Sequence, residues 1–133
     1  MLLQLMLLVI LACSSGAPPT ATTSSTMTTA PSETDIAGLK AAMDNGSPIL
    51  IDVRTPREYD AGHVPGATLI PLNELAGRLD ELAAHREQDI YLICEVGGRS
   101  GRATSMLRKQ GFSRAINVSG GTRAWREAGH PVD

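Results

Sequence analysis

The chain has 133 residues and a mass of 14.0 kDa, the size of one ordinary domain. Its 12 basic and 14 acidic residues give a formal net charge of −2, which disfavours a broad cationic face for nucleic acid. Aromatic residues make up only 3% of the chain, so a stacking platform for single strands is not expected either. Two cysteines are too few for a disulfide framework or a four-ligand zinc site. This composition leaves a small soluble domain, either an enzyme or a binding module. We expect it to hold no metal and no cofactor.

The first twelve residues form an apolar block. The stretch from Leu2 to Ala12 is apolar except for Gln4. Eleven helical residues rise only about 16 Å, roughly half of the hydrocarbon core of a bilayer, so the stretch is too short to span one. Its length is typical of the core of a secretory signal peptide, and we interpret residues 1–12 in this way.

The block ends in Ile10-Leu11-Ala12-Cys13-Ser14, which resembles the lipobox of bacterial lipoproteins. The resemblance implies acylation of Cys13, export, and a domain anchored to a bacterial membrane by lipid alone, in the periplasm or outside the cell. An ordinary signal peptide or uncleaved anchor with an incidental cysteine is the alternative. Residues 13–32 are rich in serine, threonine and proline, and we expect them to be a disordered linker.

Residues 33–133 alternate between patterns of helix and strand. Thr55-Pro56-Arg57-Glu58 has the form of a capping box with proline at the first helical position. Leucines within residues 75–82 line one side of a helix that Asn73 would cap. The expected helices begin near Asp35, Thr55, Asn73, Ser100 and Gly121. The expected strands cover residues 49–53, 68–70, 89–93 and 115–118. Short apolar strands separated by helices favour a parallel sheet that is covered on both faces.

Cys94 ends the third of these strands, and ligands of such sheets bind at the carboxyl ends of strands. It opens the loop Cys94-Glu95-Val96-Gly97-Gly98-Arg99-Ser100, which leads into a helix. Two glycines allow the backbone N–H groups to turn inward, and the helix N-terminus and Arg99 add positive charge. Such surroundings lower the pKa of a cysteine from about 8.5 to about 3.5–7.5. Cys94 is a candidate nucleophile, and simple core packing is the alternative.

The loop resembles the active-site loop of single-domain rhodanese-like sulfurtransferases. Three further stretches are similar to the same family: IDVRTPREYDAGHVPGA (residues 51–67), NVSGGTRAW (residues 117–125) and AGHPV (residues 128–132). The resemblance covers residues 35–133. It implies an α/β rhodanese fold of three layers, with a central parallel sheet of about five strands and helices on both faces. The pattern alone predicts four strands.

Four residues separate Cys94 from Arg99, which is the spacing of the sulfurtransferases. The related phosphatases and arsenate reductases have a loop one residue longer, so phosphatase activity is disfavoured. The resemblance implies a double displacement in which Cys94 takes the outer sulfur of thiosulfate or a persulfide and passes it to a thiol or cyanide.

The resemblance also implies roles for the residues around Cys94. The expected substrate-binding residues are Glu95, Val96, Gly97, Gly98 and Arg99, and the expected supporting residues are Asp52, Arg54 and Ser100. Arg99 can also brace the loop on a carboxylate. Glu95 places a negative charge beside the nucleophile, so we expect thiosulfate to be a poor donor unless that carboxylate points to solvent.

Two other functions share this fold. One is a persulfide carrier without catalytic turnover, which hands its sulfur to a protein acceptor. The other is a non-catalytic binding or redox-sensing module, which the presence of Cys94 disfavours. For the enzyme, the expected partners are a small-molecule sulfur donor and a thiol acceptor, and we expect a monomer.

Overall fold

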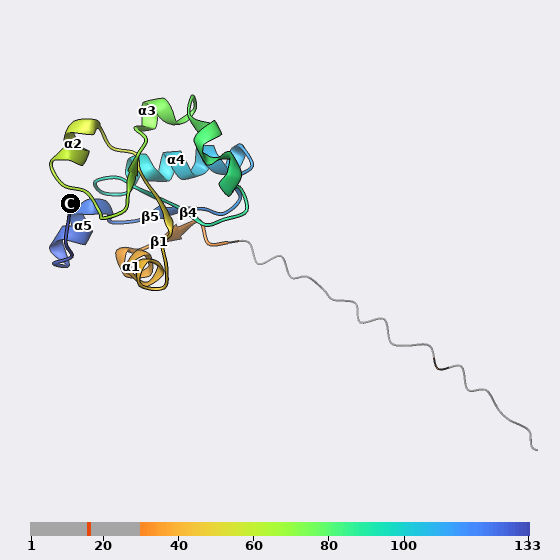
Figure 1. Cartoon of the computed structure of the whole chain (residues 1–133), viewed down its shortest axis with the longest axis horizontal. Coiled ribbons are helices and arrows are strands. Elements are labelled where there is room, and N and C mark those ends of the chain that lie inside the picture. The colour runs from red at the N-terminus through yellow and green to blue at the C-terminus, as the bar shows by residue number, and fades with distance from the viewer. Residues whose placement is uncertain (1–15, 17–29) are drawn as a thin grey trace, which may run out of the picture.

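Five parallel strands form the centre of the domain, and helices cover both faces of the sheet (Figure 1). The computed structural model describes Gly16 and residues 30–133. The sheet order is β1-β5-β4-β2-β3. The strands are β1 (Glu33–Thr34), β2 (Ile49–Asp52), β3 (Thr68–Leu69), β4 (Ile90–Ile93) and β5 (Ala115–Val118). The expected α/β fold, with its sheet of about five parallel strands, is confirmed.

Two expectations fall at the start of the chain. The signal peptide at residues 1–12 and the lipidation site at Cys13 lie outside the described residues, as does most of the linker at residues 13–32. Within the described part of the chain, no helix is long and apolar enough to cross a membrane.

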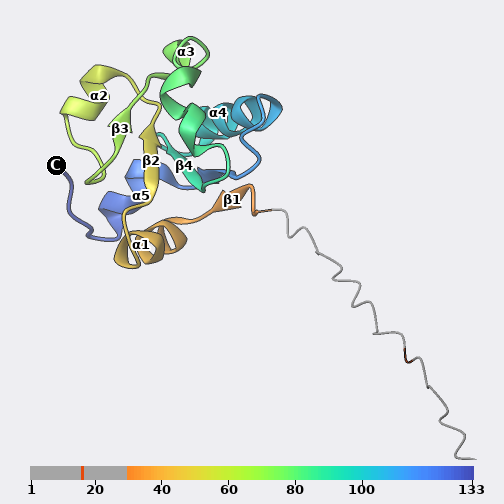
Figure 2. The same ribbon diagram turned by 45° about the vertical axis from the view of Figure 1, so that its right-hand side comes forward.

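The helices form a layer on each side of the sheet (Figure 2). One layer contains α1 (Ile36–Asp44) and α5 (Gly121–Glu127), and the other contains α3 (Leu72–Leu75), the 3₁₀ helix η1 (Leu79–His85) and α4 (Gly98–Lys109). The short helix α2 (Pro56–Asp60) joins β2 to β3. Its N-terminus has the expected capping box, because Thr55 and Glu58 each accept a hydrogen bond from the backbone N–H of the other.

The register of the central strands determines where the site lies. Asp52 is opposite Ile93 in the pairing of β2 with β4, and Leu92 is opposite Asn117 in the pairing of β4 with β5. Side chains alternate between the two faces along a strand. Leu92 and Cys94 accordingly belong to the core under α4, whereas Ile93 belongs to the core under α1 and α5. Cys94 thus emerges at the carboxyl edge of the sheet on the α4 side.

One strand has no counterpart in the sequence pattern. β1 has two residues, and they pair with Asn117 and Val118 of β5 at the edge of the sheet. Two polar residues show no alternation of apolar and polar side chains, so a pattern of side chains cannot reveal this strand. Its contacts are largely those of the backbone: the N–H of Asn117 donates to Ser32 O at 2.9 Å, and that of Ser119 donates to Thr34 O at 2.8 Å.

The prediction of a single helix that begins after Asn73 is wrong. α3 begins at Leu72 directly after Pro71, so Asn73 lies inside it and does not cap it. After one turn the N–H of Gly77 donates to Glu74 O, and the chain continues as the separate helix η1. Glycine is about 1 kcal/mol less favourable than alanine in a helix interior, which is the physical reason for a break at this position.

Candidate active site

The loop after β4 places Cys94 at the N-terminus of α4. The cysteine is only 1% exposed. Gly97 is the N-cap residue of α4 and has a φ of 107°, a backbone conformation that glycine adopts without strain. α4 begins at Gly98, two residues earlier than the sequence pattern predicts. Ser100 therefore lies in the first turn of the helix and faces the sulfur atom.

Hydrogen bonds to the sulfur atom stabilise its anionic form. The backbone N–H of Gly97 donates to Cys94 Sγ at 3.1 Å, and the Ser100 hydroxyl lies 3.3 Å from the same atom. Burial opposes ionisation, but the Ser100 hydroxyl and the amides of Ser100, Gly97 and Val96 outweigh it. The pKa of the Cys94 thiol consequently lies below its ordinary value, as a nucleophilic cysteine requires.

Asn117 is a partner of the site that the sequence analysis did not select. Its Oδ1 atom lies 2.6 Å from the Ser100 hydroxyl, and its Nδ2 atom donates to Glu33 Oε2 at 3.2 Å. The hydroxyl has one proton, so it donates either to Asn117 or to the sulfur of Cys94. The contact joins β5 to α4, and no regular spacing in the sequence connects the two residues; the only signal is the position of Asn117 at the start of the quoted NVSGGTRAW stretch.

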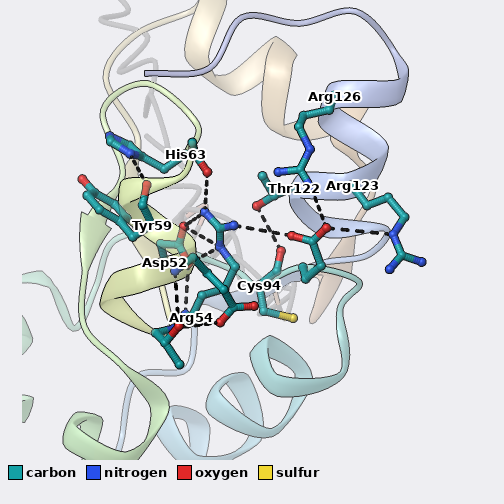
Figure 3. Close-up of polar contacts among 12 residues, drawn as sticks. Asp52, Arg54, Tyr59, His63, Cys94, Thr122, Arg123 and Arg126 are labelled. Atoms are coloured by element: carbon teal, nitrogen blue, oxygen red, sulfur yellow. Dashed lines mark hydrogen bonds and ion pairs between the residues drawn. The ribbon is translucent and has the colours of Figure 1, made fainter.

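Asp52 and Arg54 form a buried ion pair beside the loop (Figure 3). Asp52 is 0% exposed and Arg54 is 2% exposed. The Arg54 side chain donates to both carboxylate oxygens of Asp52 at 2.8–3.0 Å and to Gly62 O at 2.9 Å. Burial alone would lower the pKa of Arg54, but the hydrogen bond and the charge of Asp52 raise it above its ordinary value. Arg54 is therefore held in its charged form, paired with Asp52, at the carboxyl edge of the sheet.

The carboxylate of Glu95 lies among three arginines. Arg54 Nη1 lies 3.4 Å from it, Arg126 Nη2 donates to it at 2.5 Å, and Arg123 Nε lies 3.9 Å away. The two latter residues come from α5 and reach toward the loop (Figure 3). Glu95 is thus neither free in solvent nor an uncompensated negative charge beside Cys94.

Arg99 pairs with a carboxylate of α2. Its Nη1 and Nη2 atoms donate to the two oxygens of Glu58 at 2.8 and 2.7 Å. The hydrogen bond from Arg99 holds the pKa of Glu58 well below its usual range, and the same bond raises the pKa of Arg99. The guanidinium braces α4 against α2, and Glu58 is a second residue that the sequence analysis assigned only to a helix cap.

The N-terminus of α5 holds the backbone of the loop. Thr122 donates to Cys94 O through its N–H at 2.8 Å and through its hydroxyl at 3.1 Å, and the N–H of Arg123 donates to Glu95 O at 3.0 Å. Gly121 has a φ of 59°, and a Cβ atom there would lie 2.6 Å from the carbonyl carbon of Glu95. Only glycine permits α5 to approach the loop this closely.

Two hollows border the loop on the α4 side of the sheet. One has a volume of about 330 Å³ and lies between residues 53–55, residues 71–73 and Arg99. The other has a volume of about 620 Å³ and runs along α4 from Gly97 to Lys109. Among the described residues, no group of three or more histidine, cysteine or acidic side chains is arranged to hold a metal ion.

A five-stranded parallel sheet with a buried cysteine of lowered pKa at its carboxyl edge defines an α/β protein with its candidate site in the loop after a central strand. Residues 35–128 match the family described as "Rhodanese-like domain". The chain belongs to this family, and Cys94 occupies the active-site position of the fold.

Similar proteins agree with this assignment. A sulfurtransferase of Allochromatium vinosum is 34% identical over 89 residues, which cover 67% of this chain and 81% of that protein. The "Putative sulfur carrier protein YrkF" of Bacillus subtilis is 38% identical over 94 residues. These residues cover 70% of this chain and 50% of that protein. The structure of a human single-domain sulfurtransferase, TSTD1, has a TM-score of 0.65 at 30% identity and covers 72% of this chain and 96% of its own.

Proposed function

We propose that the protein transfers sulfane sulfur through a persulfide on Cys94. In the first step the Cys94 thiolate attacks the outer sulfur of thiosulfate or of a persulfide. The S–S bond of the donor breaks, and the leaving group departs with the bonding electron pair, as sulfite from thiosulfate or as a thiolate from a persulfide. In the second step a thiolate or cyanide attacks the outer sulfur of the new persulfide, and the electron pair of the broken S–S bond returns to Cys94 Sγ.

The observation that carries this proposal is the set of hydrogen bonds on the sulfur. The N–H of Gly97 and the hydroxyl of Ser100 lower the pKa of the Cys94 thiol and so favour its thiolate form before a donor arrives. Attack by the thiolate form of Cys94 needs no general base. The same groups stabilise the thiolate that leaves in the second step, because it is the same atom with the same charge.

The test is thiocyanate formation from cyanide with thiosulfate or a persulfide as donor. We expect catalytic turnover by the wild type and none by Cys94→Ser. Mass spectrometry of the donor-treated protein should show an adduct of about 32 Da, one sulfur atom, on Cys94. Absence of both the adduct and the turnover would contradict the proposal.

A persulfide carrier is the second candidate function. The observation that favours it is the similarity to YrkF, whose name describes a sulfur carrier. For a carrier, the adduct on Cys94 forms, but release to cyanide and small thiols is slow compared with release to a protein thiol. The two functions are separated by comparing the rate of loading with the rate of turnover.

We also propose that the chain is exported and acylated at Cys13. This proposal rests on the sequence alone, that is, on the apolar residues 1–12 and the lipobox-like segment that follows them. Metabolic labelling with a radioactive fatty acid in a bacterial host should mark the wild type and leave Cys13→Ala unmarked. Equal labelling of the two would contradict it.

A further inference from the structure

The charges of the chain are divided very unequally along the sequence. Residues 96–126 contain seven of the twelve lysines and arginines and none of the fourteen acidic residues. This segment, which forms most of the loop, α4, β5 and nearly all of α5, has a formal charge of +7, and the rest of the chain has −9. The overall charge of −2 conceals this division, and the Cys94 loop lies at the beginning of the positive segment.

Most of these cations have partners. Arg99 binds Glu58, Arg114 binds Asp89, Arg123 and Arg126 bind Glu95, and Arg108 binds backbone carbonyls.

Arg102 and Lys109 are different. Both are exposed, and neither makes a hydrogen bond or ion pair with any residue among 30–133. Residues 1–32 contain no acidic side chain that could pair with them. On the helices packed beside α4, Glu74 and Glu81 are both bound to Arg78. The two cations therefore present uncompensated charge to solvent.

Arg102 and Lys109 line one groove, the hollow of about 620 Å³ along α4. They are two helical turns apart on one side of the helix, so their Cα atoms are separated by about 10 Å. The groove begins at Gly97, whose N–H donates to the sulfur of Cys94. Beside its start, Val96 is 52% exposed, the largest exposure of a large apolar side chain in the described part of the chain.

We propose that this α4 groove is the docking surface for an acidic protein that presents a thiol to Cys94. The inference rests on the proposed function and names its acceptor. Two cations about 10 Å apart match carboxylates spread over a protein surface, whereas thiosulfate or cyanide is far too small to contact both. Exposed Val96, which lies in the Cys94 loop, supplies apolar contact beside the start of the groove, as the centre of a protein interface requires.

The transfer in the docked complex is balanced in atoms and electrons. The acceptor thiol loses its proton to solvent, and its thiolate attacks the outer sulfur of the Cys94 persulfide. A new S–S bond forms on the acceptor while the S–S bond to Cys94 Sγ breaks. The electron pair of that bond stays on Cys94 Sγ, which the N–H of Gly97 again stabilises as a thiolate.

The experiment compares two synthetic acceptor peptides with one cysteine each, identical except that four glutamates flanking the cysteine in one are glutamines in the other. Sulfur transfer from Cys94 persulfide, loaded beforehand on the full chain, is followed for both peptides at low and high salt. We expect the acidic peptide to react about tenfold faster at low salt and the difference to shrink at high salt.

The test variant is Arg102→Glu/Lys109→Glu. In this variant the faster reaction of the acidic peptide over the glutamine peptide should disappear or reverse. The matched control is Lys40→Glu/Arg114→Glu, which changes the net charge equally, on α1 of the opposite layer and at the amino end of β5. The control should keep the preference. Both variants should form thiocyanate from cyanide at the wild-type rate, because neither alters a group that contacts the sulfur.

Three outcomes would overturn the proposed docking surface. They are equal transfer rates to the two peptides from loaded wild type, a preference for the acidic peptide that survives in the test variant, and loss of that preference in the control variant. Binding to phosphatidylglycerol vesicles through Arg102 and Lys109, without a preference for the acidic peptide, would assign the groove to a membrane and also overturn it. Failure of the wild type to load sulfur would instead contradict the proposed function, which separates the two failures.

Discussion

The Ser100 hydroxyl is one of the groups that lower the pKa of the Cys94 thiol. Ser100 lies 3.3 Å from the sulfur, and hydrogen bonds to charged groups are worth about 1.5–3 kcal/mol. Since one pKa unit corresponds to about 1.4 kcal/mol, Ser100→Ala should raise the pKa of the Cys94 thiol by about one to two units. The pH dependence of alkylation by iodoacetamide measures this directly, because only the thiolate reacts.

The control for this prediction is Ser113→Ala, which removes an exposed hydroxyl in the turn between α4 and β5. Alkylation of the wild type and of the control should rise with pH through the same lowered pKa. The rise for Ser100→Ala should come at higher pH. An unchanged midpoint in a variant that unfolds at the wild-type temperature would show that the backbone amides alone hold the thiolate.

Glu95 determines how much positive charge is available near the loop. Its carboxylate engages Arg126 at 2.5 Å and also lies close to Arg54 and Arg123. Glu95→Gln removes the negative charge and leaves the guanidiniums free to attract a dianion. We expect kcat/KM for thiosulfate to rise by up to about tenfold, which corresponds to about 1.4 kcal/mol of added electrostatic attraction at these distances.

Glu127→Gln is the matched control, since it removes one exposed carboxylate from the opposite end of α5. Its kcat/KM for thiosulfate should stay near that of the wild type. If Glu95→Gln keeps its fold and shows no gain, the carboxylate does not limit the use of thiosulfate, and the expectation of a poor donor loses its physical basis.

At the scale of elements, the approach of α5 to the Cys94 loop depends on Gly121. A side chain there would meet the carbonyl carbon of Glu95 at 2.6 Å, and the φ of 59° costs a non-glycine residue about 1–2 kcal/mol. Gly121→Ala should therefore lower the unfolding temperature and displace the loop, with loss of most thiocyanate formation. Gly46→Ala is the control, because no atom lies within 4 Å of a Cβ at that position. Equal activity of the two variants would contradict this account.

The ion pair of Arg99 with Glu58 links α4 to α2 and has a pH dependence of known sign. The pKa of Glu58 is lowered in the folded state, so its contribution to stability is present above the ordinary carboxyl pKa and is lost as the pH falls toward the lowered value. Glu58→Gln should be less stable than the wild type at pH 7, and the difference should shrink steadily below about pH 4.5.

Urea unfolding at several pH values measures this difference. Glutamine at position 58 can still accept the hydrogen bond of the capping box, so the comparison isolates the charge. Glu81→Gln is the matched control on the exposed pair with Arg78, for which screening by solvent makes the effect small. A constant difference between pH 7 and pH 3 would contradict the prediction.

The sequence predicted those elements that have a strong local signal. The apolar strands β2, β4 and β5 and the capping box of α2 follow from periodicity and from short-range hydrogen bonds, and Cys94 follows from its place after β4. β1 and the break between α3 and η1 could not be predicted in this way. The first depends on backbone pairing with β5, and the second depends on how one turn ends.

The partners of the site show the same limit. Glu58 meets Arg99, and Asn117 meets Ser100, across separations of 41 and 17 residues. No periodicity connects these pairs, because they are brought together only by the order of strands in the sheet. A sequence pattern can therefore select a candidate nucleophile, but the groups that hold its neighbours in place are determined by tertiary structure.

At the scale of the whole molecule, residues 30–34 connect the edge of the sheet to the site. Arg108 of α4 donates to the carbonyls of Ala30 and Pro31. Asn117 donates to the next two residues, through its N–H to Ser32 O and through its Nδ2 to the Glu33 carboxylate. Asn117 in turn contacts Ser100, which contacts the sulfur of Cys94. Loss of β1 should therefore change the hydrogen bonding around the sulfur of Cys94.

Two shortened chains test this connection, one that begins at Ala30 and one that begins at Asp35. The second lacks the hydrogen bonds from Asn117 and Ser119 to Ser32 and Thr34. With about 1 kcal/mol for each lost bond, it should be less stable than the first by about 2–4 kcal/mol in urea unfolding. Because Asn117 loses its partner Glu33, the pH midpoint of Cys94 alkylation should also shift between the two chains. Identical stability and identical midpoints would show that the edge strand is independent of the site.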